Sequence, residues 1–105
     1  MPAITVQDLK KRLDNSEKFV LLDVREKFEY DICRIPNSKL IPVGELPSRM
    51  SELDSADEIV IHCKSGVRSA KALKLLKEAG FGKLWNVTGG IQAWADEIDT
   101  SVPKY

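Results

Sequence analysis

The sequence predicts a single-domain α/β fold, with a parallel sheet of about five strands flanked by helices on both faces. Short apolar runs alternate along the chain with stretches in which apolar residues recur at helical spacing. The apolar runs are continuous, which is typical of parallel strands that are buried on both faces. A length of 105 residues is enough for one hydrophobic core and too short for two. We therefore expect residues 1–105 to form one domain.

The first half of the chain is expected to begin with a capped helix and a buried strand. Thr5 is expected to cap a helix over residues 6–13, with Asp8 three residues later as in a capping box. Residues 19–24, F-V-L-L-D-V, form a continuous apolar run that indicates a buried strand. The next elements are expected to be a short helix at residues 27–31, a short strand at 40–41 and a helix at 44–53.

The second half repeats the alternation of strand and helix. Residues 58–63, E-I-V-I-H-C, indicate a strand that ends at Cys63, and the turn K-S-G leads from it into a helix over residues 67–79. The apolar face of this helix is expected to comprise Val67, Ala70, Leu73, Leu76 and Ala79. Gly80 fits the left-handed position that ends a helix. The remaining elements are expected to be a strand at residues 84–87, a helix at 91–98 and a candidate linker at 99–105.

Composition and charge argue against several classes of partner. The 16 Lys and Arg residues balance 16 Asp and Glu residues, whereas binding to nucleic acid or to an anionic membrane calls for a basic excess. No apolar run approaches the roughly 20 residues that span a bilayer, and the N-terminus lacks the regions of a signal peptide. Two cysteines and one histidine are too few for a disulfide scaffold or a histidine-rich metal site. We expect a cytoplasmic protein without membrane, nucleic-acid or metal binding, although a missing signal also fits a domain cut from a longer chain.

Cys63 is the leading candidate for a catalytic residue. It follows a strand of the predicted parallel sheet, and ligands bind beyond the carboxyl ends of such strands, near helix N-termini. The next turn can direct successive N–H groups at one anion; Gly66 supplies backbone freedom, and Lys64 and Arg68 add charge to the helix dipole. These features are expected to lower the pKa of the Cys63 thiol and to favour the nucleophilic thiolate. The alternative, a small buried residue that merely ends a strand, explains neither the glycine nor the cations.

Four stretches of the chain resemble, in order, the signatures of the rhodanese family. Residues 63–68, C-K-S-G-V-R, are similar to its six-residue active-site loop; the others are L-L-D-V-R-E-K-F-E-Y at 21–30, I-P-N-S at 35–38 and T-G-G-I-Q-A-W at 88–94. The resemblance covers nearly the whole chain. It implies a sulfurtransferase in which Cys63 takes the sulfane sulfur of thiosulfate or a persulfide and passes it to a nucleophile. Such two-step covalent catalysis needs no metal or organic cofactor.

One departure from the family pattern narrows the resemblance. Cys33 and Arg34 stand before Ile35-Pro36, where most rhodaneses have Gly-His. The variant D-I-C-R-I-P and the ending V-P-K-Y are similar to the C-terminal rhodanese domain of adenylyltransferase–sulfurtransferases. This likeness implies transfer to the activated C-terminus of a ubiquitin-like sulfur carrier protein, in molybdopterin, thiamine, cysteine or tRNA thiolation pathways. It also implies an adenylylating domain as a partner or as a preceding part of the chain.

The candidate substrate-binding residues lie mainly in the active-site loop. They are Lys64, Ser65, Gly66, Val67, Arg68 and Ser69, together with Arg25 and Arg34 outside it. Two cations in the first turn of a helix oppose its dipole, which favours a bound anion. The alternatives are ordinary solvation of Lys64, Arg68 and Arg34, and a surface ion pair between Arg25 and Glu29, four residues apart.

Three further residues near these motifs are assigned structural roles. Asp23 is expected to accept hydrogen bonds from loop amides. His62 precedes Cys63 on a strand, so its side chain points to the opposite face, where a hydrogen-bonded core histidine is expected and not a base for the thiol. Cys33 is either inert or a redox partner of Cys63.

Two other functions stay open from the sequence. Cysteine phosphatases and arsenate reductases also place a cysteine loop before a helix N-terminus, but they use Cys-x5-Arg, whereas four residues separate Cys63 from Arg68. The smaller loop suits one sulfur atom better than a tetrahedral oxyanion, and no carboxylate soon after it offers a general acid. Rhodanese-like domains without the cysteine act as non-catalytic interaction modules, and the presence of Cys63 argues against that role.

Overall fold

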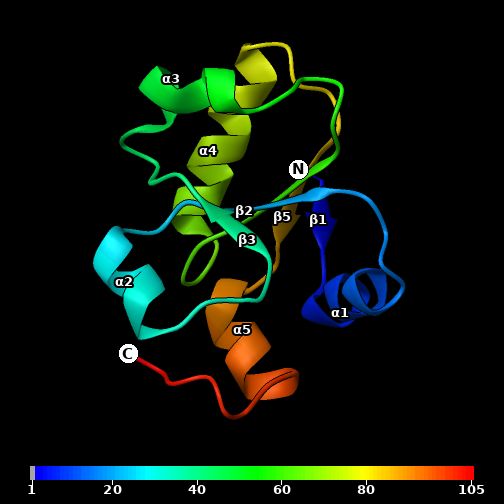
Figure 1. The fold of residues 1–105 in the computed structure, drawn as a ribbon, viewed down its shortest axis with the longest axis vertical. Coiled ribbons are helices and arrows are strands. Elements are labelled where there is room, and N and C mark those ends of the chain that lie inside the picture. The colour runs from blue at the N-terminus through cyan, green and yellow to red at the C-terminus, as the bar shows by residue number, and fades with distance from the viewer. Residues whose placement is uncertain (1) are drawn as a thin grey trace.

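The computed structural model describes residues 2–105, which form a five-stranded parallel sheet with helices packed around it (Figure 1). The strand order is β1-β5-β4-β2-β3. The strands are β1 (Ala3–Ile4), β2 (Val20–Asp23), β3 (Ser38–Leu40), β4 (Ile59–His62) and β5 (Leu84–Val87). The helices are α1 (Val6–Asp14), α2 (Lys27–Ile32), α3 (Leu46–Arg49) followed by a 3-10 turn (Met50–Glu52), α4 (Val67–Glu78) and α5 (Gly90–Glu97). The predicted fold class is confirmed.

The predicted elements differ from the observed ones mainly at their ends. Strand β1 was not predicted, because two residues at a sheet edge carry no recognisable pattern. The predicted helix at residues 44–53 is divided into α3 and the 3-10 turn. Thr5 caps α1 as predicted, since its Oγ1 accepts a hydrogen bond from the N–H of Asp8 at 3.1 Å.

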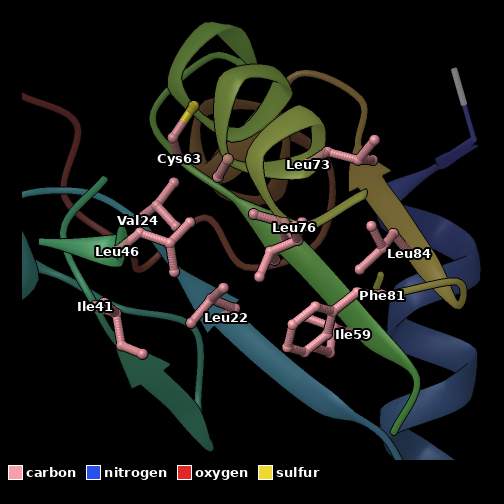
Figure 2. Close-up of a cluster of buried hydrophobic side chains, with 12 residues drawn as sticks. Leu22, Val24, Ile41, Leu46, Ile59, Cys63, Leu73, Leu76, Phe81 and Leu84 are labelled. Atoms are coloured by element: carbon pink, nitrogen blue, oxygen red, sulfur yellow. The ribbon is translucent and has the colours of Figure 1, made fainter. Parts of the chain in front are cut away.

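Two hydrophobic clusters cover the two faces of the sheet. Because successive side chains of a strand point to opposite faces, Leu22 and Ile61 join one cluster while their neighbours Leu21 and Val60 join the other. The first cluster packs against α3 and α4 (Figure 2) and ends at Cys63, whose sulfur lies beside α4. The second cluster packs against α1 and α5. The sheet is therefore covered on both faces, and Cys63 belongs to the α4 side.

The predicted apolar face of α4 is confirmed at Leu73 and Leu76 and wrong at its two ends. Val67 is 77% exposed and Ala79 is also exposed. The buried residues are Ser69, Ala72, Leu73 and Leu76, which follow the i, i+3, i+4, i+7 spacing of one helical face. Val67 is the first residue of α4, directly after the turn that follows β4. Gly80 ends the helix as predicted, with φ +96°.

The last seven residues do not behave as the predicted linker. Lys104 forms an ion pair with Asp96 of α5, and the chain ends beside α2 (Figure 1). Tyr105 is hydrogen-bonded there to Glu29. This tail therefore belongs to the folded domain. None of the helices within residues 2–105 is long and apolar enough to cross a membrane.

Candidate active site

Cys63 lies where β4 ends and the turn into α4 begins. Gly66 caps α4 in the left-handed region, with φ +117°, a conformation that side chains other than glycine rarely adopt. This turn directs the Gly66 N–H at the Cys63 sulfur, with 3.1 Å between N and Sγ. The Ser69 hydroxyl lies 3.4 Å from the same Sγ. Only 1% of Cys63 is exposed, so these short hydrogen bonds surround a thiol that is nearly withdrawn from water.

The surroundings of Cys63 lower the pKa of its thiol. Burial alone raises this pKa, because the charged thiolate is poorly solvated there. Hydrogen bonds from the Ser69 hydroxyl and from the backbone amides of Ser69, Gly66 and Ser65 outweigh burial, because they stabilise the thiolate. The sequence analysis expected backbone amides, the helix dipole and two cations to lower this pKa; the amides do so, and the Ser69 hydroxyl is a contributor that it did not name.

Asn86 is a member of the site that the sequence analysis missed. It lies on β5, and its Oδ1 accepts a hydrogen bond from the Ser69 hydroxyl at 2.6 Å. Its Nδ2 lies 3.4 Å from the Gly66 carbonyl oxygen, to which it donates. An amide side chain within an otherwise apolar strand, L-W-N-V, is the signal that could have revealed it. Asn86 thus connects β5 to Gly66 in the turn and to Ser69 in the first turn of α4.

Backbone hydrogen bonds from the start of α5 hold the active-site loop in place. The N–H of Ile91 donates to the carbonyl of Cys63 at 2.9 Å, and that of Gln92 to the carbonyl of Lys64 at 3.1 Å. The approach is so close that a Cβ at Gly90 would lie 2.5 Å from the Cys63 oxygen. The T-G-G-I-Q stretch therefore fixes the backbone from which the Cys63 side chain projects.

Arg68 does not stand free as an anion receptor. Its Nη1 and Nη2 donate to Oε1 and Oε2 of Glu29 at 2.5 and 2.9 Å, which joins α4 to α2. These hydrogen bonds lower the pKa of Glu29 to about 2, against the raising effect of burial. The anion that the sequence led us to expect beside Arg68 is thus a carboxylate of the chain itself.

Arg25 pairs with Asp23 and not with the Glu29 carboxylate. Its guanidinium has no exposed surface and donates to Asp23 Oδ2 at 2.7 Å and to the carbonyl of Cys33 at 2.7 Å. It reaches only the backbone oxygen of Glu29, at 3.3 Å, so the predicted surface ion pair is wrong. Asp23 also accepts from the Arg25 N–H at 3.0 Å, which confirms its predicted role. Arg25 therefore holds the loop after β2 in place, and its buried guanidinium is not accessible to substrate in this conformation.

Lys64 lies against the ring of Tyr105, a residue that the sequence analysis placed in a linker. The distance from Nζ to the ring centroid is 4.5 Å, within the range of a cation–π contact. The Tyr105 hydroxyl accepts a hydrogen bond from Arg25 Nη1 at 3.0 Å and donates one to Glu29 Oε2 at 2.7 Å. The C-terminal tail is therefore part of the candidate site.

The remaining candidates lie at the surface. Ser65 and Val67 are exposed in the loop. Arg34 is also exposed and stacks on the ring of Tyr30, 4.1 Å from its centroid. Whether Ser65, Val67 and Arg34 contact substrate stays a prediction.

Cys33 and His62 are buried. Cys33 is 8% exposed and receives a weak hydrogen bond from Arg25 Nη1 at 3.9 Å. His62 is fully buried, and neither ring nitrogen has a hydrogen-bond partner within residues 2–105, so the expected hydrogen-bonded histidine is wrong. Burial lowers the pKa of His62 to about 4. Within the same residues, no group of three or more His, Cys, Asp or Glu side chains could hold a metal ion.

Comparison with related chains agrees with this arrangement, in which a cysteine between a parallel strand and a helix accepts hydrogen bonds from backbone amides. The family model described as the rhodanese-like domain matches residues 5–97. The chain belongs to the rhodanese-like family. A crystal structure of a rhodanese-like domain protein from Staphylococcus aureus superposes with a TM-score of 0.86 at 38% identity, covering 93% of this chain and 95% of that one.

Two curated relatives of this rhodanese-like chain carry names that bear on activity. A protein named sulfurtransferase from Allochromatium vinosum is 38% identical over 92 residues, which is 88% of this chain and 86% of that protein. MoeZ of Mycobacterium tuberculosis, named as a probable adenylyltransferase/sulfurtransferase, is 38% identical over 104 residues, which is 97% of this chain and 26% of MoeZ. The chain spans about half the length or less of MoeZ and several other relatives. These names support a sulfurtransferase role for the rhodanese-like domain.

Proposed function

We propose that this protein transfers sulfane sulfur through a persulfide on Cys63. The observation that carries the proposal is the Cys63 Sγ at the carboxyl end of β4, with the Gly66 N–H 3.1 Å away and a lowered thiol pKa. Lowering the pKa of a thiol makes it a better nucleophile, because a larger fraction is present as thiolate at any given pH below that pKa.

The reaction proceeds in two displacement steps. The Cys63 thiolate attacks the sulfane sulfur of thiosulfate, forming an S–S bond while the S–S bond of thiosulfate breaks and sulfite leaves with the electron pair. A second nucleophile then attacks the outer sulfur, and the Cys63 thiolate leaves with the electron pair of the protein S–S bond. With cyanide as the acceptor, the product is thiocyanate. The amides that stabilise the thiolate also suit a persulfide, whose outer sulfur is anionic.

The physiological acceptor we propose is a ubiquitin-like sulfur carrier protein in the cytoplasm. The support is the likeness to MoeZ, whose name combines adenylyltransferase and sulfurtransferase activities. An adenylylating domain, on this chain or on a partner, would activate the C-terminus of the carrier. Thiosulfate and protein persulfides are the candidate donors.

The arrangement of Arg68 argues against a cysteine phosphatase or arsenate reductase. Both Nη atoms of Arg68 are occupied by Glu29, and four residues separate Cys63 from Arg68. A tetrahedral oxyanion would have to displace a two-point hydrogen-bonded ion pair, which is among the stronger polar contacts in proteins. We therefore expect neither phosphate release nor tight phosphate binding.

Replacing Cys63 tests the proposed function. After treatment with thiosulfate, intact-mass spectrometry of the parent is expected to show one added sulfur atom that dithiothreitol removes, and cyanide is expected to yield thiocyanate. Cys63→Ser is expected to abolish both results, while Cys33→Ser, the matched control at the other buried cysteine, retains them. Thiocyanate formation by a folded Cys63→Ser variant at the parent rate would refute the assignment. Absence of the added sulfur in the parent would favour an interaction module.

A further inference from the structure

Tyr105 contacts Lys64 of the active-site loop directly, and it contacts Arg68 of the same loop through Glu29. Its ring lies under the Lys64 ammonium, 4.5 Å from Nζ to the centroid. Its hydroxyl donates to Glu29 Oε2 at 2.7 Å, and the same oxygen accepts from Arg68 Nη2 at 2.9 Å. One side chain from the C-terminal tail thus touches Lys64 itself and the partner of Arg68.

The hydroxyl of Tyr105 is held between two buried groups of opposite charge. It accepts from Arg25 Nη1 at 3.0 Å while donating to Glu29. Burial raises the pKa of Tyr105 to about 12, so the hydroxyl keeps the proton that it donates. The ring also packs against the second hydrophobic cluster, so apolar contacts hold it in addition to these two hydrogen bonds, and the ring in turn limits where Lys64 can pack.

The charges of the three nearby cations are not equally available to a ligand. Arg25 pairs with Asp23, and Arg68 pairs with Glu29. Lys64 makes no ion pair with a carboxylate within residues 2–105, and its ammonium rests on a neutral ring. An incoming anion therefore meets the charge of Lys64 with less internal compensation than the charge of Arg25 or Arg68. A lysine side chain has four flexible bonds, so a fixed ring beneath it restricts where that charge stands.

We propose that Tyr105 is a positioning residue that holds the Lys64 ammonium in place beside the active-site loop and thereby favours anionic sulfur donors over neutral ones. This inference rests on the proposed sulfur transfer and names the donor class that the site prefers. The doubly charged thiosulfate gains from a positioned cation, while a neutral alkyl persulfide gains little. The relevant quantity is the ratio of kcat/KM for thiosulfate to kcat/KM for a neutral persulfide.

The test compares two substitutions of Tyr105 in this ratio. Tyr105→Leu removes ring and hydroxyl, and the ratio is expected to fall about fivefold, as the loss of one cation–π contact implies. Tyr105→Phe keeps the ring under Lys64, and the ratio is expected to stay within about twofold of the parent. Phe19→Leu is the matched control, because it removes a ring under Arg12 before the start of β2, at the opposite end of the strand from Asp23.

A double-mutant cycle separates positioning from general support of the fold. In a Lys64→Ala background, Tyr105→Leu is expected to cause no further fall in the ratio, because the charge that it positions is gone. An unchanged ratio in Tyr105→Leu would overturn the inference, whether both donors keep their rates or lose activity equally. If the leucine variant does not fold, a fivefold fall in Tyr105→Phe would overturn the assignment to the ring. Each result leaves the proposed function standing as long as the parent still forms the Cys63 persulfide.

Discussion

The Ser69 hydroxyl is the side-chain group that stabilises the Cys63 thiolate, and its removal has a calculable effect. Ser69 Oγ lies 3.4 Å from Cys63 Sγ and donates to Asn86 Oδ1 at 2.6 Å. A hydroxyl has one proton, so donation to the thiolate costs the bond to Asn86. A hydrogen bond to a charged group contributes about 1.5–3 kcal/mol and a neutral one about 0.5–1.5 kcal/mol. The difference is about 1–1.5 kcal/mol, or roughly one pKa unit.

Ser69→Ala is therefore expected to raise the pKa of Cys63 by about one unit. At pH values below that pKa, the thiolate fraction and the rate of attack on thiosulfate should both fall about tenfold. The pKa is measured from the pH dependence of alkylation by iodoacetamide, in a Cys33→Ser background that leaves one reactive thiol.

Ser65→Ala is the matched control for this experiment. Ser65 is exposed, and its contribution to the thiolate is a backbone amide that alanine retains. The pKa of Cys63 should stay unchanged in this variant. An unchanged pKa in Ser69→Ala would refute the role of the hydroxyl, and equal shifts in both variants would show that either substitution merely disturbs the loop.

Two further predictions concern the buried side chains of Cys33 and His62. Cys33→Ser is expected to keep thiosulfate–cyanide activity within about twofold, because the loop supplies both the nucleophile and its hydrogen bonds; a hundredfold loss, about 2.7 kcal/mol in barrier, would instead make Cys33 a relay thiol. His62 has its pKa lowered to about 4 by burial, so the unfolded state binds more protons as pH falls from about 6.5 to 4. The free energy of unfolding should therefore fall by about 1.4 kcal/mol per pH unit in that range. His62→Phe should remove this slope in urea titrations at pH 7, 6 and 5, and an unchanged slope would show that other groups cause it.

Much of the fold and the local surroundings of Cys63 could be predicted from the sequence because the signals are local. Continuous apolar runs and helical spacing extend over 4–12 residues in the longer elements, so the α/β class and most element positions follow from short windows. Cys63, Gly66 and the helix start after them are adjacent in the chain. The turn chemistry and the lowered thiol pKa could therefore be expected without knowledge of distant residues.

The side chains that complete the site come from distant parts of the chain. Arg68 and Glu29 are 39 residues apart, Ser69 and Asn86 are 17 apart, and Tyr105 and Glu29 are 76 apart. The strand order β1-β5-β4-β2-β3 places β4 between β5 and β2, and this order brings Asn86 and α2 to the two sides of Cys63. No local pattern encodes that order, and a four-residue spacing suggested the wrong partner for Glu29.

The sequence by itself determined the fold class, the position of Cys63 at the end of a strand and the turn that follows it, since these depend on neighbouring residues and on backbone geometry. Only the tertiary structure decided which of the nearby cations pair with carboxylates of the chain. Arg25, Asp23 and Glu29 are buried, and they form ion pairs, Arg25 with Asp23 and Glu29 with the partly exposed Arg68, because an uncompensated charge is costly away from water. Tyr105, a half-buried residue of the C-terminal tail, is hydrogen-bonded to one member of each ion pair, Arg25 and Glu29, and its ring packs against Lys64.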